Sequence, residues 1–209
     1  MIRVTAELSP RERYQLLTSL VVPRPIAWIS TRSEAGARNL APFSYFGAVS
    51  ATPFLVSVSI GSRAGVDKDT LRNIRQTGAF CVNVATERQL VAMNESAGEY
   101  GPEVDEFDRA GLQSAEAQTV AAPYVADCPA VLECRVSQIV ELPGSPNTLV
   151  IGEVLCVRLA DEVPLIPGTL FADSRALQPV ARLWGDLYAL IGETPALLRP
   201  VVDRAPGAP

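Results

Sequence analysis

Hydrophobic and polar residues alternate along several segments of the chain in the way that is typical of half-buried β-strands. The clearest case is FLVSVSI at residues 54–60, where the alternation predicts that Ser57 and Ser59 face away from the core. Further apolar runs predict strands at residues 26–30, 41–49 and 79–85. Two longer runs, 130–142 and 148–161, are joined by the turn sequence PGSPN and predict a long hairpin.

Helical signals are few and short. Residues 9–20 predict a helix with Ser9 as the N-cap and Pro10 at its first position. A second helix is expected after residue 66, opened by Asp67, Asp69 or Thr70 and stopped by Gly78. Thr86 is expected to cap a third helix, and the polar stretch around Gly36 predicts a hairpin between the first two strands. Residues 97–127 read as loop-rich.

These elements together indicate a mainly β protein, a β-barrel with appended helices. About six strands, short helices and 17 prolines favour this class, while the regular strand–helix alternation of a dinucleotide-binding fold is missing. We expect one domain over residues 1–209, with a flexible tail from about residue 196.

Composition narrows the function classes. A net charge of -5 argues against a general nucleic-acid binder, which needs a basic face. No apolar run approaches the roughly 18 residues that span a bilayer, and the N-terminus lacks the apolar stretch of a signal peptide, so a cytoplasmic protein is expected. The four cysteines form no C-x-x-C pair, which disfavours zinc-ribbon or thioredoxin chemistry.

The chain contains no histidine. This excludes Ser-His-Asp and Cys-His catalysis, histidine-ligated metals and acid–base work by an imidazole. An enzyme with this sequence would have to rely on a cofactor that carries the reactive atom.

The loop SIGSRAGVDKDT at residues 59–70 is a candidate phosphate site. Small residues let an anion approach backbone N–H groups, and the start of the following helix adds its dipole. Arg63 and Lys68 add positive charge, and Lys68 is the only lysine beside 17 arginines. The alternative is a solvated loop before a capped helix, in which Asp67 and Asp69 partly cancel the charge.

Two further segments are candidates for contact with a flat heterocycle. In VVPRPIAWIST, at residues 21–31, two prolines bracket Arg24 inside a strand-like run, and proline cannot donate to a strand ladder. We therefore expect Arg24 and the backbone at Ile26 and Ala27 to meet a ligand rather than another strand. NLAPFSYFGAVS, at residues 39–50, offers a second edge with Ser44 among aromatic residues. The alternative is core packing of Trp28, Phe43 and Phe46.

The ordered series LLTSLVVPRPIAWIST, NLAPFSYFGAVSATPFLVSVSIG, KDTLRNIRQTGAFCVNV, MNESA and VDEFDRAGL resembles the flavin reductase-like family with the FMN-binding split-barrel fold. The later LECRV, LVIGEVLCVRLAD and LQPVARLWGDLYALIGE continue the likeness, which covers about residues 12–192. The resemblance implies a homodimer with FMN held noncovalently near the subunit interface.

Carried over by position, the resemblance assigns three groups of cofactor-binding residues. Those bordering the isoalloxazine ring would be Arg24, Pro25, Ile26 and Ala27, and those lining its other contacts Ser44, Tyr45 and Phe46. Those around the ribityl phosphate would be Ser59, Ile60, Gly61, Arg63, Lys68, Asp69 and Thr70. Asn83 is a further candidate that could equally be a structural hydrogen-bonding residue.

The resemblance implies an FMN-binding oxidoreductase, an NAD(P)H-dependent flavin reductase that supplies reduced flavin to an oxygenase partner or reduces a small acceptor. Two departures bear on that activity: Cys156 stands where relatives often have histidine, and Trp184 where a glycine is commoner. The alternatives are an FMN-binding electron-transfer or redox-sensing protein without reductase activity, and a split barrel with an empty or altered pocket.

Overall fold

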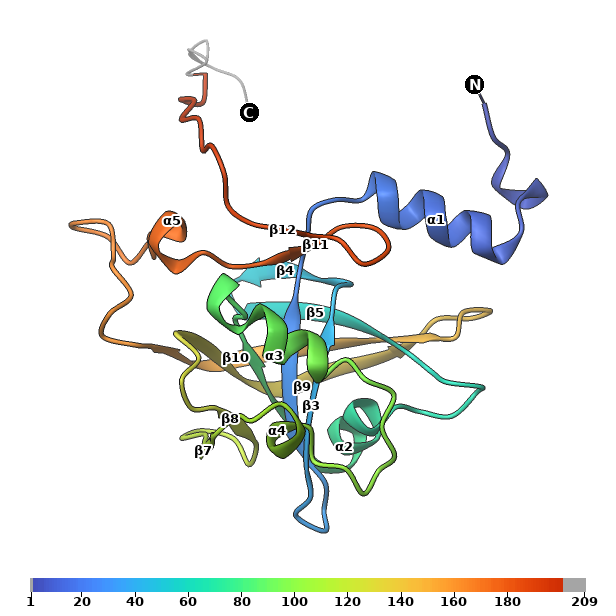
Figure 1. Ribbon diagram of the computed structural model, residues 1–209, viewed down its shortest axis with the longest axis horizontal. Helices are drawn as coiled ribbons and strands as arrows, with labels where there is room; N and C mark the ends of the chain where they lie inside the picture. The colour runs from blue at the N-terminus through green and yellow to red at the C-terminus, as the bar shows by residue number, and fades with distance from the viewer. Residues whose placement is uncertain (1, 201–209) are drawn as a thin grey trace, which may run out of the picture.

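The computed structural model describes residues 2–200 and is dominated by a seven-stranded antiparallel sheet (Figure 1). Its strand order is β3-β2-β6-β9-β10-β5-β4. The strands are β2 (Ala27–Arg32), β3 (Arg38–Phe43), β4 (Phe46–Ala51), β5 (Phe54–Gly61), β6 (Ala79–Asn83), β9 (Ala130–Glu141) and β10 (Asn147–Leu159).

The two edge strands of this sheet, β3 and β4, are consecutive in the chain and joined only by Ser44 and Tyr45. Because so short a link cannot span an open sheet, the edges must curl towards each other. The N–H of Ser59 on β5 donates to the carbonyl of Tyr45 at 2.8 Å, which ties the link to the far side of the sheet. The result is a split barrel, as expected.

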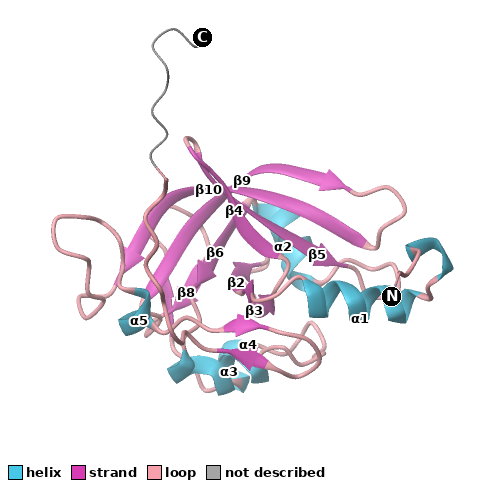
Figure 2. Ribbon diagram, turned by 90° about the horizontal axis from the view of Figure 1, so that it is seen from above, coloured by secondary structure: helices cyan, strands magenta, loops and turns pink. Residues whose placement is uncertain are grey.

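Two small sheets accompany the barrel. One contains β1 (Arg24–Pro25), β11 (Ala181–Arg182) and β12 (Tyr188–Ala189), and the other contains β7 (Ser114–Glu116) and β8 (Pro123–Val125). The helical segments are η1 (Thr5–Glu7), α1 (Pro10–Leu20), α2 (Asp69–Thr77), η2 (Glu87–Gln89), α3 (Leu90–Glu95), α4 (Glu106–Arg109) and α5 (Ser174–Leu177). Helix α1 extends away from the barrel at the upper right of Figure 1, and α3 and α4 lie together at the lower side of Figure 2.

The apolar side chains form two cores on opposite faces of the sheet. The barrel interior includes Ile29, Val58, Leu71 and Phe80. The outer face includes Trp28, Met93 and Phe107, covered by α3 and α4. Among residues 2–200, no helix combines the length and the apolar character needed to cross a bilayer.

Most of the predicted elements are present. Helix α1 starts with the capping box of Ser9 and Glu12, Gly78 ends α2 with φ +67°, and Val56, Val58 and Ile60 are buried while Ser57 and Ser59 are not. The single strand expected at 41–49 is wrong: it breaks at Ser44 and Tyr45, where the chain crosses between the barrel edges. The frayed tail from about 196 falls partly on residues 201–209, outside the described part of the chain.

The expected cap of α2 is also wrong. Lys68 is the N-cap residue, and no side chain hydrogen-bonds to the free N–H groups of the first turn. Asp67 instead pairs with Arg75 at 2.8 Å, and Asp69 pairs with Arg72 at 2.5 Å. Because both carboxylates are engaged by arginines on the helix, the start of α2 remains open.

Candidate functional site

A cleft of about 480 Å³ opens at the N-terminus of α2, and we call it the α2 cleft. Its walls come from the loop before α2, from Asn39 on β3, and from the 97–102 loop with the start of α4. Four of the predicted phosphate residues line it: Arg63, Lys68, Asp69 and Thr70. The loop is tightly turned, because Arg63 and Val66 exchange both backbone hydrogen bonds.

The charges of the α2 cleft are largely paired with one another. Arg63 contacts Glu99 at 2.6 Å, and Asp69 and Arg72 form the pair given above. Lys68 differs, because no carboxylate of the described residues lies within 4.0 Å of its ammonium group, which sits 5.8 Å from the centre of the Phe43 ring. An unpaired cation at an open helix N-terminus is the arrangement that binds an anion.

A buried polar network fixes the floor of this cleft. The Thr70 hydroxyl donates to Asn39 Oδ1 at 2.7 Å, and Asn39 Nδ2 donates to the Glu106 carboxylate at 3.1 and 3.2 Å. The backbone N–H of Leu40 also donates to Glu106 at 3.0 Å. The network therefore ties α2 and α4 to the same edge strand. Because the hydroxyl proton of Thr70 is engaged, its backbone N–H is the group left for a ligand.

A second, more open groove of about 400 Å³ lies beside the end of α1, and we call it the proline groove. It contains Pro23 and Pro25 together with the β3–β4 link, and its walls include five predicted ring-contact residues: Arg24, Pro25, Ser44, Tyr45 and Phe46. Burial raises the pKa of the Tyr45 hydroxyl, so it stays protonated at neutral pH. Tyr45 and Phe46 are half-buried in the walls of this groove.

The structure corrects the expected use of Arg24. Its guanidinium donates to the carbonyls of Thr18 at 2.7 Å, Val21 at 2.8 Å and Leu183 at 2.6 Å. The segment also meets another strand after all, since Arg24 and Pro25 pair with Arg182 and Ala181 of β11. Arg24 therefore fastens the end of α1 to the β11–β12 hairpin, and its engaged side chain forms the groove wall.

Several other candidates are placed with their side chains turned into the protein. Ala27 and Ile60 are fully buried in the barrel core, so only their backbones could meet a ligand, and Ile26 packs in the outer core. Asn83 has the structural role: its amide donates to Trp28 O and Ser30 Oγ and accepts from the N–H of Val125. Ser59 Oγ accepts from Asn147 Nδ2 at 3.0 Å, beside Gly61.

The α2 cleft and the proline groove border the same edge strand: Asn39 of β3 lines the cleft, and Ser44, directly after β3, lines the groove. The Lys68 ammonium lies near the Phe43 ring, and the Arg24 guanidinium lies 6.0 Å from the centre of the Tyr45 ring. Phe43 and Tyr45 are two residues apart, about 7 Å of extended chain. One elongated ligand could therefore contact both, with an anionic end at α2 and a flat apolar end at the groove.

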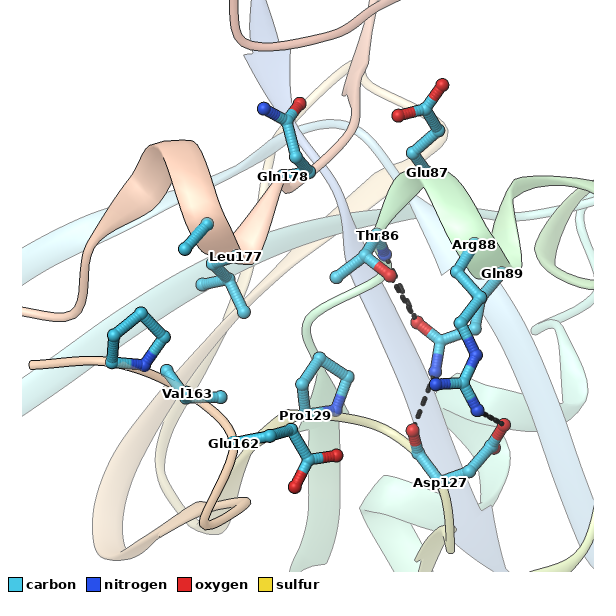
Figure 3. A pocket seen from close by; sticks show the side chains of 12 residues that line it. Thr86, Glu87, Arg88, Gln89, Asp127, Pro129, Glu162, Val163, Leu177 and Gln178 are labelled. Atoms are coloured by element: carbon cyan, nitrogen blue, oxygen red, sulfur yellow. Dashed lines mark hydrogen bonds and ion pairs between the residues drawn. The ribbon is translucent and has the colours of Figure 1, made fainter.

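A third cavity, of about 380 Å³, contains none of the predicted site residues (Figure 3). Three of its lining residues are hydrogen-bonded to one another: the Thr86 hydroxyl donates to Gln89 Oε1 at 2.9 Å, and Gln89 Nε2 donates to the carbonyl of Asp127 at 3.0 Å. Arg88 also pairs with Asp127 at 3.5 Å. These groups therefore hold η2 to the loop before β9.

Sequence reasoning missed Asn39, Glu106 and Tyr100, which also line the α2 cleft. Asn39 and Glu106 lie at the edges of motifs that carry the family resemblance, NLAPFS and VDEFDRAGL, but neither motif has the spacing of a known ligand pattern. They come together only because β3 and α4 pack against each other.

Fold and site together define a split-barrel protein with an uncapped helix N-terminus, an unpaired lysine and an aromatic groove. The family model of the flavin reductase like domain matches residues 19–177. An uncharacterized protein from Halalkalibacterium halodurans is 37% identical over 94% of this chain and 95% of its own length. Another from Bacillus subtilis is 35% identical over 93% and 96%.

Solved structures of similar fold support the same family. Nitrilotriacetate monooxygenase component B from Bacillus cereus superposes with a TM-score of 0.90 at 32% identity, covering 94% of this chain and 98% of that one. The 2-nitrobenzoate 2-nitroreductase of Pseudomonas fluorescens gives 0.87 at 26% identity, covering 99% and 100%. The chain belongs to the flavin reductase-like family. It is a flavoprotein of the oxidoreductase class.

Proposed function

We propose that the protein is an FMN-dependent oxidoreductase in which NAD(P)H donates hydride to the flavin. The reduced flavin would serve an oxygenase partner, a diffusible acceptor or a small substrate. One observation carries the choice of FMN: the unpaired Lys68 ammonium stands at the uncapped start of the nine-residue helix α2. A terminal phosphate is the flavin group that such a site would hold.

The residues present suit this cofactor along its whole length. Lys68 and the free N–H groups at the start of α2 would hold the phosphate, with Arg63 at the mouth of the cleft. Pro25 and the Ser44–Phe46 segment would flank the isoalloxazine ring in the proline groove. The comparisons support this class of chemistry, since the structural relatives include a monooxygenase component and a nitroreductase.

Bound flavin would supply the hydride acceptor and the electron donor of the reaction. The protein's part is to bind and orient, because a chain without histidine has no imidazole to move protons. The Tyr45 hydroxyl, which is protonated at neutral pH, offers a hydrogen-bond donor at the groove. The side chains of Leu17, Val21 and Phe46 give the same groove an apolar wall.

We further propose that the protein is a homodimer. Helix α1 exposes apolar side chains along its length, including Tyr14, Leu17 and Leu20, the last of which is 76% exposed. Val49 and Phe54, at the end of β4 and the start of β5, are also about half exposed. A second copy covering these residues would remove apolar surface from water. Light scattering tests this, and a monomeric mass at micromolar concentration would contradict it.

An anaerobic mixing experiment tests the reductase activity. Protein with bound FMN should lose its yellow absorbance on addition of NADH or NADPH. If dithionite bleaches the flavin and neither nicotinamide does, the protein is an electron-transfer or redox-sensing flavoprotein without its own reductase step. The two departures from the family pattern make that alternative relevant. Cys156, where relatives often have histidine, lies on β10, and Trp184, where a glycine is commoner, lies 48% exposed in the β11–β12 turn. A protein that takes up no FMN would contradict both functions.

A further inference from the structure

Glu106 is the one carboxylate lining the α2 cleft that has no cationic partner among residues 2–200. Of the seven charged residues lining the cleft, Arg63 and Glu99 pair, Asp69 and Arg72 pair, and Asp67 pairs with Arg75 outside the lining. This leaves Lys68 and Glu106 unpaired. The cleft therefore contains one cation and one carboxylate that are not paired with an opposite charge within the described part of the chain.

The Glu106 carboxylate is buried, with 7% of the residue exposed, and its hydrogen-bond donors are the neutral groups of Asn39 and Leu40. Burial raises its pKa, partly opposed by these hydrogen bonds, and the nearby Asp69 raises it further. The other charged groups around it are committed elsewhere: on β3, Arg38 pairs with Asp105 and Asp108, and across the cleft Arg63 pairs with Glu99. When an anion enters the cleft and engages Lys68, no other neighbouring cation of the described residues is free to offset the charge of Glu106. Protonation of the carboxylate is then the change that removes the repulsion.

The hydrogen bonds that run from Glu106 through Asn39 to Thr70 limit the distance between the Glu106 carboxylate and the first turn of α2. Glu106 lies 3.1 Å from Asn39 Nδ2, and Asn39 Oδ1 lies 2.7 Å from the Thr70 hydroxyl in the first turn of α2. Adding the width of the amide, the carboxylate is at most about 8 Å from that hydroxyl. For a dianion at that separation, an effective dielectric constant of about 20 and physiological salt give a weakening of binding of up to about tenfold, and less at a larger distance.

We propose that the α2 cleft binds the flavin phosphate together with a proton, which Glu106 takes up. This rests on the proposed FMN site and adds to it a residue that sets how strongly the cleft prefers phosphorylated ligands. Ionised Glu106 opposes the phosphate, whereas neutral Glu106 does not. Glu106 touches Asn39 and the backbone of β3, so it acts on the phosphate through charge rather than by contact.

The test compares FMN with riboflavin, which has the same ring and ribityl chain but no phosphate. Dissociation constants for both are measured by calorimetry for the wild type, Glu106→Gln and Glu133→Gln. Glu133 is the matched control: it too is a buried carboxylate accepting backbone N–H bonds, from Gln118 and Thr119, and it lines none of the cavities described above. Glutamine removes the charge and keeps an oxygen that accepts from Leu40, while its amide nitrogen replaces the other carboxylate oxygen that accepts from Asn39.

At about pH 8, Glu106→Gln should bind FMN several-fold and up to about tenfold more tightly than the wild type, with riboflavin affinity unchanged. The gap should close as the pH falls through the raised pKa of wild-type Glu106, and Glu133→Gln should follow the wild type throughout. The phosphate has its own ionisation near pH 6, but all three proteins share it. Wild-type protein should also take up more protons on binding FMN than Glu106→Gln, measured in buffers of different ionisation enthalpy.

Equal or weaker FMN binding by Glu106→Gln at about pH 8 would overturn the inference, as would an equal change for riboflavin, and the FMN site itself would stand. If Glu106→Gln does not fold, proton uptake by the wild type decides, and none beyond that of the phosphate itself overturns the inference. A wild type that binds no FMN at any pH would remove the proposed function, and this inference with it.

Discussion

Replacing Lys68 with alanine removes the unpaired cation of the α2 cleft and leaves its ion pairs in place. Coulomb's law gives about 4 kcal/mol for two unit charges 4 Å apart at an effective dielectric constant of 20. Lys68 is exposed, so salt screening lowers this value, and ordering the flexible side chain costs up to about 1.5–2 kcal/mol. A net loss of about 1–3 kcal/mol remains, in line with hydrogen bonds to charged groups.

The expected result is FMN binding weakened about 5- to 150-fold, with riboflavin binding changed less than twofold. Fluorescence quenching of each flavin on titration with protein measures both constants. Lys68→Arg keeps the charge and should recover most of the affinity. Arg88→Ala, which removes an exposed cation beside the third cavity, serves as the control and should leave both constants unchanged.

Two outcomes would refute this reasoning. Unchanged FMN affinity in Lys68→Ala would mean that the phosphate does not reach this helix terminus. Equal weakening of FMN and riboflavin would mean that Lys68 supports the ring or the fold rather than the phosphate. Circular dichroism of the variant distinguishes a loss of folding from the loss of a ring contact.

Three further predictions concern stability. Arg24→Met should lower the free energy of unfolding by about 2–4 kcal/mol, measured in urea, because three carbonyls lose a charged donor; wild-type stability would contradict the assigned role. Gly152→Ala should cost about 1–3 kcal/mol, since the new Cβ would collide with the buried Phe80 ring, and a cost under about 0.5 kcal/mol would contradict this. Burial acts to raise the pKa of Glu133, but the hydrogen bonds that its carboxylate accepts from Thr119 and Gln118 and the charge of Arg158 leave this pKa lowered. The ionised carboxylate therefore contributes to folding stability above its ordinary pKa, and this contribution is lost as the pH falls through the lowered value. Stability should therefore drop between about pH 5 and pH 3 more in the wild type than in Glu133→Gln, and parallel curves would refute the assignment.

Local signals in the sequence located most of the fold. The capping box at Ser9, the stop at Gly78 and the period-two pattern of 54–60 each depend on neighbouring residues, and each is present in the structure. The break at Ser44 and Tyr45 could not be found in this way. The break results from barrel closure, because β3 pairs with β2 while β4 pairs with β5 at the opposite edge of the sheet.

The candidate site is predictable only in part, for the same reason. The loop before α2 gives a local signal, one lysine among arginines, and in the structure Lys68 has no carboxylate partner within 4.0 Å among residues 2–200. The role of Arg24 could not be predicted from the sequence, because one of the carbonyls that it binds, that of Leu183, belongs to a residue far away along the chain. Asn39 and Glu106 give no signal, since a buried amide–carboxylate contact depends on the packing of α4 against β3.

A crystal structure of the protein with FMN tests the central claim most directly. We predict the phosphate within hydrogen-bonding distance of Lys68 Nζ and the first N–H groups of α2, with the isoalloxazine ring against Pro25 and the Ser44–Phe46 segment. An FMN molecule whose phosphate lies outside the α2 cleft, or whose ring lies away from the proline groove, would contradict it.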